Sequence, residues 1–486
     1  MASSPVKATV PYDLPAPENP VMSTMHDDGS RRWMHPRCSP GRYWQARRAL
    51  AYFLIAVFTI VPYIHVGGKP LVLLDLPARE FTILGYTFLP TDTVLLAFLL
   101  VTLIIGICLA TALLGRVWCG WMCPQTVYME FVFRPIERLF DGRPGPRHTP
   151  GKKSTPLRKV LKYAVYLAIS LYLAHTFLAY FVGVNRLAQW VTQSPFEHPG
   201  AFLLMVAVTG LMMFDFSYFR EQTCLVACPY GRLQSVMLDR DSLIVSYDPQ
   251  RGEPRAKGRR EEGDGKGDCV DCGMCTDTCP TGIDIRDGLQ MECIACTQCV
   301  DACDSMMQRL GKPTGLVRIS SQARIAGEAG RLVRPRVIVY PAVICVFVAA
   351  FGLTLMTKQT ADVTLLRGPG RPFYELASGE IANQIRVKIR NRSGAAAEYR
   401  IETVGGGPAR LEADENPLAV AAGKSRTEPI QVAIPPAAFD AGKYELRLRI
   451  SDGRDFNRQY SWRLLGPRNP AAPAATAAIP SEPAHD

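Results

Sequence analysis

Residues 269–280 read Cys269-Val-Asp-Cys272-Gly-Met-Cys275-Thr-Asp-Thr-Cys279-Pro280, and residues 293–303 repeat the pattern as Cys293-Ile-Ala-Cys296-Thr-Gln-Cys299-Val-Asp-Ala-Cys303. Two C-x2-C-x2-C-x3-C runs in tandem have the thiolate spacing of a two-cluster bacterial ferredoxin. The first three cysteines of each run bind one [4Fe-4S] cluster, and the fourth binds the other cluster. We therefore predict one cluster held by Cys269, Cys272, Cys275 and Cys303, and a second held by Cys293, Cys296, Cys299 and Cys279.

Two four-cysteine zinc sites are the alternative for this region, since zinc sites also use C-x2-C pairs. Zinc does not require a third cysteine at the same spacing in both runs, followed each time by a fourth. The second run lacks the proline that follows the first run, but thiolates rather than proline bind the iron. The pattern therefore predicts an α+β ferredoxin module that carries single electrons.

Five apolar stretches are each long enough to cross a bilayer as a helix, which takes about 20 residues. They lie approximately at 49–66, 94–114, 160–184, 201–218 and 337–356, so the ferredoxin module falls between the fourth and the fifth. The opening segment is long, polar and proline-bearing, which does not fit a cleavable signal peptide. We expect a multi-pass protein of the bacterial cytoplasmic membrane.

Basic residues are distributed unevenly, although the whole chain carries a formal charge of +11. They crowd before the first span, between the second and third, and between the fourth and fifth, and few lie in the other two connections. This alternation follows the positive-inside rule. It predicts that the N-terminus and the ferredoxin module face the cytoplasm and that the C-terminal region faces the periplasm. Because topology accounts for the charge, we expect no nucleic-acid partner.

Composition divides the chain into six parts. We expect a flexible basic cytoplasmic segment at 1–46, a four-helix transmembrane region at 47–240, a cytoplasmic linker with the ferredoxin domain at 241–335, a fifth transmembrane helix at 336–357, a periplasmic domain at 358–467 and a disordered Ala/Pro-rich tail at 468–486. The predicted fold class is a multi-domain membrane protein.

The region from 358 to 467 changes to strand-like alternation. Its alternating runs lie at 384–390, 398–402, 429–434 and 443–450, and clusters of Gly, Asn, Asp and Ser separate them. Period-two alternation is typical of half-buried strands. Several short strands in about 105 residues favour an all-β immunoglobulin-like sandwich.

A second cysteine set recurs at the ends of two pairs of spans. The first pair ends in Cys119-Gly-Trp-Met-Cys123-Pro124, and the second pair ends in Cys224-Leu-Val-Ala-Cys228-Pro229. Each unit is two spans followed by C-x3-C-P, so the units keep one orientation and can bring their motifs together. A spacing of four predicts both sulfurs on one helical face, with proline kinking or ending the helix. The recurrence favours a redox or metal role over simple packing.

Three chemistries fit the four thiols at Cys119, Cys123, Cys224 and Cys228. They could bind copper, because thiolates favour Cu(I) and reduce Cu(II). They could cycle between dithiol and disulfide, or they could hold a third iron–sulfur cluster. The sequence leaves all three open.

Other polar residues near the membrane carry less weight. Met122 could add a soft thioether donor, but a packing role accounts for it better, and Asp215 near the end of the fourth span fits a solvated carboxylate. No glycine-rich nucleotide loop stands between a strand and a helix, so no flavin or NAD site is expected. The electron donor is then another protein or a quinol.

These features together resemble the cytochrome c oxidase accessory proteins called CcoG, FixG or RdxA. The resemblance covers about 31–465, and the membrane and ferredoxin parts are shared with the related quinol dehydrogenase subunits NapH and NosR. It implies reduction of Cu(II) to Cu(I) for assembly of a cbb-type oxidase. By the match of motifs, the membrane cysteines of the family correspond to Cys119, Cys123, Cys224 and Cys228, and its cluster ligands to the eight central cysteines.

With this resemblance, the sequence predicts a membrane cupric reductase with two [4Fe-4S] clusters and copper as a further metal. Its partners would be the lipid bilayer, a cytoplasmic electron donor or quinol, and oxidase assembly factors or a copper chaperone. One alternative is a quinol dehydrogenase that passes electrons through the clusters to a partner. Another is a non-enzymatic redox sensor or assembly scaffold.

Overall fold

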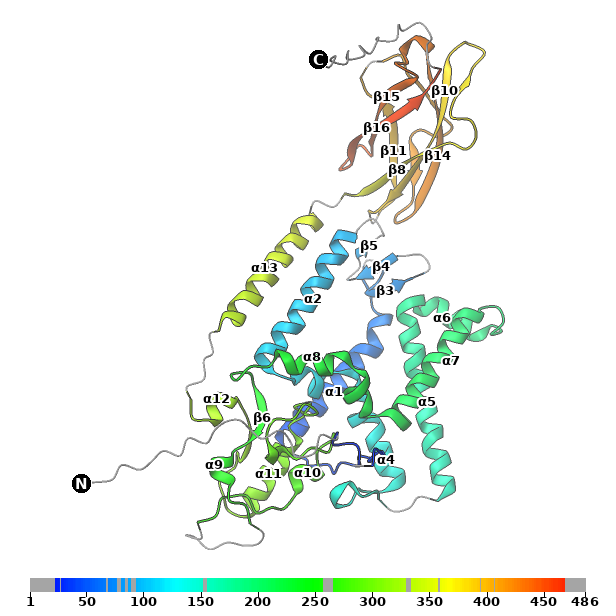
Figure 1. The fold of residues 1–486 in the computed structure, drawn as a ribbon. Coiled ribbons are helices and arrows are strands. Elements are labelled where there is room, and N and C mark those ends of the chain that lie inside the picture. The colour runs from blue at the N-terminus through cyan, green and yellow to red at the C-terminus, as the bar shows by residue number, and fades with distance from the viewer. Residues whose placement is uncertain are drawn as a thin grey trace, which may run out of the picture. The chain divides into compact units, whose positions relative to one another are not determined.

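The computed structural model describes residues 22–26, 28–66, 69–76, 80–83, 86–88, 93–151, 155–256, 265–328, 334–356, 359–393, 395–405 and 407–467. The chain forms two compact units, Met1–Gly352 and Leu353–Asp486 (Figure 1). The tail expected to be disordered, 468–486, lies outside the described residues, as do residues 1–21 of the N-terminal segment.

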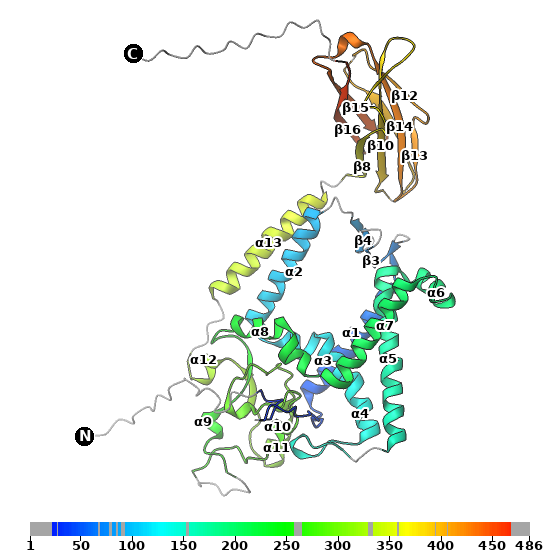
Figure 2. The same cartoon turned by 45° about the vertical axis from the view of Figure 1, so that its right-hand side comes forward.

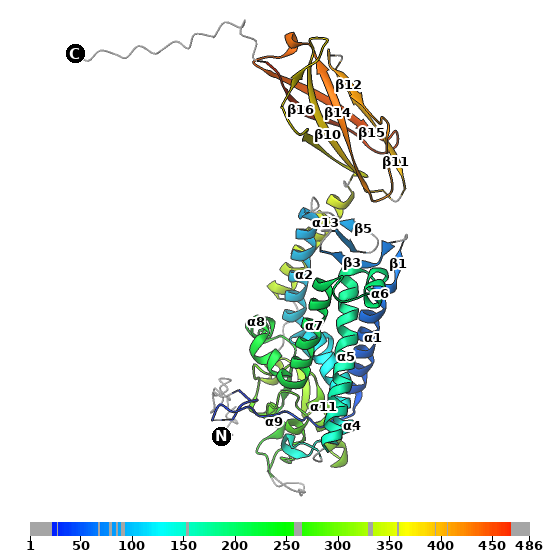
Figure 3. The ribbon, with the colours of Figure 1, turned by 90° about the vertical axis from the view of Figure 1, so that its right-hand side faces the viewer.

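Five helices of the described chain are long and apolar enough to cross a membrane, which confirms the predicted spans. They are α1 (Arg42–Ile60, extended by a 3-10 turn to Tyr63), α2 (Thr93–Leu114), α5 (Pro156–Val182), α7 (Pro199–Phe214, extended by a π-helix to Phe219) and α13 (Pro335–Met356). Helices α1, α5 and α7 run side by side in the first unit (Figure 3). Their many exposed apolar side chains fit a lipid environment, because such a surface would be costly in water.

Short elements that the hydropathy pattern did not predict connect the spans. Between α1 and α2 lie a hairpin, β1 (His65–Val66) with β2 (Lys69–Pro70), and a three-stranded antiparallel sheet, β3 (Val72–Asp75), β4 (Glu80–Ile83) and β5 (Tyr86–Phe88). Helix α6 (Val184–Thr192) joins α5 to α7. Runs of two to four residues are too short to carry a periodic signal.

The ferredoxin module contains one small sheet and several short helices (Figure 2). Strand β6 (Ile244–Tyr247) pairs antiparallel with β7 (Val317–Ser320). The helices are α9 (Pro249–Gly252), α10 (Met274–Asp277), α11 (Gln298–Arg309) and α12 (Gln322–Ile325), with a 3-10 turn at Ile285–Asp287. The core joins apolar residues such as Ile285 and Val300 to cysteines of both runs. This arrangement confirms the predicted α+β module.

Where it is described, at 22–26 and 28–46, the N-terminal segment differs from the flexible one expected at 1–46. Residues 22–26 and 28–41 form hydrogen bonds to the ferredoxin module and to the turn after α7, as at Arg37 and Thr24, and α1 already begins at Arg42. Thr24 and Met34 are fully buried. Ser23 Oγ donates a hydrogen bond to the carbonyl oxygen of Thr281 at 2.7 Å. Contacts with residues far away in the sequence hold this polar segment in place, and such contacts cannot be predicted from composition.

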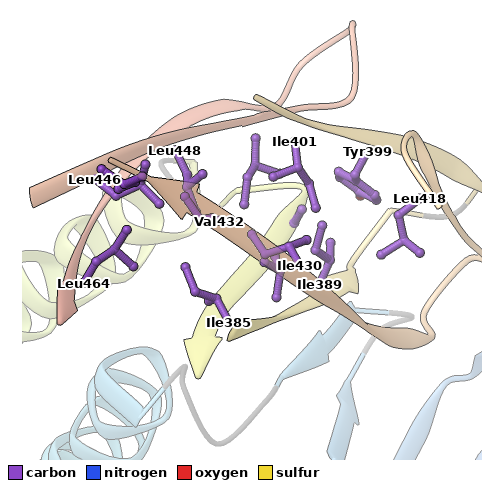
Figure 4. Packing of buried hydrophobic residues seen from close by; sticks show 14 of the residues in the cluster. Ile385, Ile389, Tyr399, Ile401, Leu418, Ile430, Val432, Leu446, Leu448 and Leu464 are labelled. Atoms are coloured by element: carbon purple, nitrogen blue, oxygen red, sulfur yellow. The ribbon is translucent and has the colours of Figure 1, made fainter. Parts of the chain in front are cut away.

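The second unit is a two-layer antiparallel sandwich, as predicted. One sheet has the order β12 (Arg410–Ala413), β14 (Ser425–Ile434), β10 (Ile381–Asn391) and β8 (Ala361–Arg367), with β9 (Tyr374–Glu375) also paired to β10. The other has the order β13 (Leu418–Val420), β11 (Ala397–Thr403), β15 (Lys443–Ser451) and β16 (Asn457–Leu465). Buried side chains such as Ile385 and Ile430 from the first sheet pack against Ile401 and Leu448 from the second (Figure 4).

Candidate functional site

Four cysteines from both ferredoxin runs surround one cavity of the module. Cys269, Cys272, Cys275 and Cys303 line a volume of about 360 Å³ together with apolar side chains such as Met306 and Leu316. These are the four residues predicted for the first cluster. The fourth comes from the second run, so the chain brings the four cysteines of the predicted crossed set to one cavity.

The other four cysteines line a neighbouring cavity of about 340 Å³. They are Cys279, Cys293, Cys296 and Cys299, the set predicted for the second cluster. Cys275 borders this cavity as well as the first, so the two cavities share a wall. Two cavities of nearly equal volume, the first lined by four thiols and the second by four others together with the shared Cys275, fit two copies of one sulfur-ligated group.

The backbone repeats around the two cavities. Asp271 and Ala295 precede the second cysteine of their runs and have φ of 51° and 52°. Gly273 and Thr297 follow that cysteine and have φ of 69° and 60°. A positive φ is uncommon for residues other than glycine, and its recurrence at matching positions marks a loop held in a strained conformation at a functional site. Helices α10 and α11 begin at the next residue in each run.

Burial sets the protonation of these thiols. It raises the pKa of Cys275 and of Cys303 to about 12, and the pKa of Cys296 to about 11. Iron must therefore displace protons when it binds, because the thiolate is the ligand. Among the described residues, no three His, Cys, Asp or Glu side chains are gathered closely enough for a single metal ion. A cubane tolerates this spacing because each thiolate binds its own iron.

Each C-x3-C-P motif has the same local geometry, which differs from the regular helix expected. Cys119 lies in a π-helix at Trp118–Met122, and Cys224 lies in a π-helix at Thr223–Ala227. Cys123 and Cys228 then take extended backbone angles, and the following proline begins helices α3 (Pro124–Tyr128) and α8 (Pro229–Met237). The sulfurs are thus not one α-turn apart, and each second cysteine stands at the break itself.

The backbone hydrogen bonds of the two motifs match as well. The Cys123 N–H donates to Trp118 O at 2.8 Å, and the Cys228 N–H donates to Thr223 O at 2.8 Å. Both bonds span five residues, which defines the π-turn. Single-turn π-bulges inside helices are frequent at functional sites. The sequence repeat is therefore a structural repeat.

The four motif cysteines act on one another electrostatically. Burial raises the pKa of Cys119 to about 12, and the charge of Cys123 adds to this effect. Burial also raises the pKa of Cys224, with further contributions from Cys123, Cys119 and Cys228. The structure therefore brings both motifs into one neighbourhood. All fifteen cysteines of the chain fall in the described part, and none forms a disulfide there.

The first motif packs directly on the second cluster cavity. Cys119, Ile294 and Cys296 form one buried cluster, with Tyr230 packed against it. Gly120 lies so close to this loop that a Cβ atom would stand 2.5 Å from Ile294 O and 2.8 Å from Ala295 O. Only glycine fits this approach without displacing the backbone. A candidate cluster ligand thus adjoins a candidate membrane thiol.

Two buried arginines from the membrane region, Arg47 and Arg116, contact residues beside the same cavity, which the sequence did not predict. Arg47 is 0% exposed and donates from Nε to Gly120 O at 2.9 Å. Its two Nη atoms are buried and have no hydrogen-bond partner among the described residues. Arg116 donates to Cys293 O at 2.8 Å. In the sequence both are basic residues near span ends. That position predicts which side of the membrane they lie on but not which residues they contact.

A buried ionic network joins the membrane region to the cluster loops. Arg220 forms two hydrogen bonds of 3.0 Å with the Glu137 carboxylate on α4 (Arg134–Asp141). Arg134 pairs with Glu130, and its Nη2 donates to Pro280 O at 3.4 Å, next to Cys279. Burial opposes ionisation of Glu137, but a hydrogen bond from His35 and the charge of Arg220 outweigh it and hold the pKa of Glu137 well below its usual range.

Family models match three parts of the chain. A model for a 4Fe-4S dicluster domain matches residues 219–322, and a model for a 4Fe-4S binding domain matches residues 96–144. A model described as an Ig-like fold at the C-terminal of FixG matches residues 351–467. The first model spans the eight ferredoxin cysteines together with Cys224 and Cys228, and the second spans Cys119 and Cys123.

Three curated relatives align along most of the chain. Protein RdxB of Cereibacter sphaeroides is 32% identical over 87% of this chain and 93% of RdxB. Protein RdxA of the same organism is 31% identical over 76% of this chain and 82% of RdxA. Nitrogen fixation protein FixG of Rhizobium meliloti is 31% identical over 74% of this chain and 77% of FixG. With its paired ferredoxin cavities, five membrane helices and C-terminal sandwich, the chain belongs to the FixG/RdxA family of membrane iron–sulfur proteins.

Proposed function

We propose that this membrane electron-transfer protein reduces Cu(II) to Cu(I) for the assembly of a cbb-type cytochrome c oxidase. One observation carries the proposal: Cys119 of the first C-x3-C-P motif packs against Cys296, which lines the second cluster cavity. Electron carriers in contact through buried side chains are suited to exchange electrons, and thiolates are the ligands that favour Cu(I).

In this proposal the two cysteine sets of the ferredoxin module hold the clusters. Cys269, Cys272, Cys275 and Cys303 hold one [4Fe-4S] cluster, and Cys279, Cys293, Cys296 and Cys299 hold the other. When bound, each cluster supplies transfer of one electron at a potential that its surroundings tune. Arg47 and Arg116 contribute positive charge beside the second site, and the apolar lining of both cavities excludes water.

The motif cysteines Cys119, Cys123, Cys224 and Cys228 are the proposed copper site. Each Cu(II) takes up one electron and becomes Cu(I), which soft thiolates retain. Since no group of three ligands is gathered in the described chain, a pair of thiols would hold the ion first, and further thiols would close on it. The copper ion is substrate here and leaves for the oxidase.

Sidedness follows the charge pattern. We place the ferredoxin module in the cytoplasm and the sandwich of β8–β16 in the periplasm, because basic residues crowd the connections on the ferredoxin side. The sandwich would dock an oxidase assembly factor or a copper chaperone. The relatives named RdxA, RdxB and FixG support the family but do not name these partners.

The experiment is anaerobic Cu(II) reduction by the purified full chain, with dithionite-reduced and desalted protein and a Cu(I)-specific chelator. The test variant changes Cys119, Cys123, Cys224 and Cys228 to Ser together. Its matched control changes Cys38, Cys108 and Cys345, three cysteines that belong to neither set. We expect Cu(I) formation to fall at least tenfold in the test variant only. Equal rates in both variants would sink the proposal.

Two rivals make different predictions in the same assay. A quinol dehydrogenase would lose quinol oxidation in the test variant while copper reduction persists. A redox sensor or scaffold would support oxidase assembly even when the eight ferredoxin cysteines are replaced and the clusters are absent. The proposed cupric reductase requires both cysteine sets.

A third cluster at the motif cysteines is the specific alternative to copper there. The match of a 4Fe-4S binding model to residues 96–144 favours it, because that stretch contains Cys119 and Cys123 but neither ferredoxin run. Iron and sulfide analysis with electron paramagnetic resonance decides the matter. Roughly eight irons per chain support two clusters, whereas roughly twelve would assign the motif cysteines to a third.

A further inference from the structure

A large cavity lies among three spans, beside both C-x3-C-P motifs. Its volume is about 1720 Å³, counting the part that is open to its surroundings. Helices α1, α5 and α7 supply apolar walls, and the two π-helices of the motifs supply Trp118, Met122, Thr223 and Ala227. These residues flank the motif cysteines in the sequence, so an occupant of the cavity would lie next to the proposed electron-transfer site.

Few polar side chains interrupt the apolar lining. The Tyr128 hydroxyl is buried and has no hydrogen-bond partner among the described residues. The Asp215 carboxylate accepts a hydrogen bond from Thr223 and also borders the cavity. Asp215 is half-buried, so it is not the fully solvated carboxylate that its place at a span end suggested. Thr223 and Gln125 also line the cavity, but Thr223 already donates to Asp215 and Gln125 donates to Arg220 O. Within the described part of the chain, the Tyr128 hydroxyl therefore remains as an unpaired donor in largely apolar surroundings.

The residues that line the cavity favour some membrane molecules over others as its ligand. A lipid acyl chain would fill the apolar space but leave the Tyr128 hydroxyl unpaired, which is costly in a buried site. A charged solute would lose its hydration without gaining enough partners. The ring of a quinol can satisfy both groups, because one of its hydroxyls can accept from the Tyr128 hydroxyl and the other can donate to the Asp215 carboxylate. Aromatic walls at Phe58 and Phe216 suit such a ring.

We propose that this cavity binds the ring of a membrane quinol, which accepts a hydrogen bond from Tyr128 and donates one to Asp215. The isoprenoid tail leaves past Leu211 and Phe214, which line the cavity and are 67% and 51% exposed. Their exposure on a membrane helix gives a lipid-soluble ligand direct access from the bilayer. Neither residue carries a polar group that would hinder an apolar tail.

A link between this ligand and copper rests on the proposed function. Oxidation of one quinol to quinone releases two electrons and two protons. These two electrons balance the reduction of two Cu(II) to two Cu(I), and the protons leave to the solvent. The quinol would then be the electron donor, a role that the sequence left open between another protein and a quinol.

The test titrates the full chain in phosphatidylcholine nanodiscs with 2-heptyl-4-hydroxyquinoline N-oxide, a quinone-ring analogue whose fluorescence falls on binding. Tyr128→Phe removes only the hydroxyl, and Leu211→Trp fills the exposed side of the cavity. Tyr52→Phe is the matched control, since Tyr52 is 52% exposed on α1 and does not line the cavity. Competition with short-chain ubiquinone and menaquinone analogues distinguishes the two kinds of ring.

We expect saturable binding by the unchanged chain and by Tyr52→Phe. Tyr128→Phe should bind about tenfold more weakly, the usual effect of one lost hydrogen bond, and Leu211→Trp should not bind. Fluorescence that falls equally for all variants and for empty nanodiscs would overturn the proposal. So would binding that excess phosphatidylcholine displaces but neither quinone does.

Measurements of ligand binding and of Cu(II) reduction on the same samples show which of the two proposals fails, the quinone site or the cupric reductase. Absence of binding with dithionite-driven Cu(II) reduction intact overturns the quinone site and leaves cupric reduction standing. Binding with the expected variant pattern, but without Cu(I) formation from any donor, supports the site and rejects cupric reduction.

Discussion

At the scale of single residues, the buried Arg47 places a positive charge near Cys296, which lines the second cluster cavity. Its buried guanidinium acts on Cys296, where burial raises the thiol pKa and the Arg47 charge opposes that rise. A buried cation without a carboxylate partner is costly, so it persists where another negative charge compensates it. A cluster held by four thiolates supplies such a charge.

Arg47→Gln should lower the reduction potential at the site of Cys279, Cys293, Cys296 and Cys299. Removal of the positive charge destabilises the reduced, more negative form, by about 60 mV if roughly 1.4 kcal/mol of interaction is lost. A redox titration followed by electron paramagnetic resonance measures the shift. Arg48→Gln is the control because Arg48 is exposed and stacks on Trp44. Equal potentials in the two variants would contradict this role.

Gly120 tests the contact between the first motif and the cluster loop. Gly120→Ala places a methyl group against the carbonyl oxygens of Ile294 and Ala295, so the two elements must move apart. We expect copper reduction to slow at least tenfold while iron content stays unchanged. Gly106→Ala on α2 is the matched control, since nothing lies within 4 Å of its added Cβ. A normal rate for Gly120→Ala would show that this contact does not matter.

At the scale of elements, the ionic network fastens α4 to the turn at Arg220. Glu137→Gln leaves Arg220 without its carboxylate, and loss of one partner of a buried pair typically costs about 3–5 kcal/mol. The pKa of Glu137 is lowered in the folded chain, so its contribution is present above the unfolded pKa of about 4.3 and is lost as pH falls below it.

The predicted pH dependence follows from that sign. Thermal unfolding in detergent, followed by circular dichroism, should find Glu137→Gln less stable than the unchanged chain at pH 7. The difference should shrink as pH is lowered from about 5 toward 3, because Glu137 takes up a proton in the unfolded state of the unchanged chain while it stays ionised in the folded state. A difference in stability between the two chains that stays constant over this pH range would mean that ionisation of Glu137 does not stabilise the fold.

The secondary-structure elements also show how much of the fold could be predicted from the sequence. Cysteine spacing, apolar length and strand alternation are local signals. Apolar length and strand alternation predicted the five spans and the sandwich, and cysteine spacing predicted two sets of four cysteines that the structure places around two cavities. The π-turns of the motifs were missed because a spacing of four fits an α-helix equally well. The capping of α1 was missed too: Asp301 of α11 accepts from the N–H groups of Tyr43 and Trp44 at 3.2 and 2.8 Å, a contact across more than 250 residues.

At the scale of the whole molecule, the chain forms two compact units, and we expect a different role for each. The first contains both cysteine sets and the large cavity, and the second has its own closed core. A chain that ends after Met356 should therefore keep its iron content and its rate of copper reduction. If oxidase assembly in cells fails with this truncated chain, the sandwich acts in docking. Loss of iron on truncation would instead make the sandwich necessary for the fold of the first unit.

The central claim is that the four motif cysteines pass stored electrons to copper. A single-turnover experiment tests it most directly: the protein is reduced, freed of reductant and mixed anaerobically with excess Cu(II), and Cu(I) per chain is counted. The account predicts about two more Cu(I) per chain from protein with reduced clusters than from protein with oxidised clusters, one for each of two one-electron clusters, because Cu(II) reduction by thiols alone is the same in both samples. It predicts almost no difference between these samples when Cys119, Cys123, Cys224 and Cys228 are all serine. A difference of about two Cu(I) per chain in that variant would contradict it.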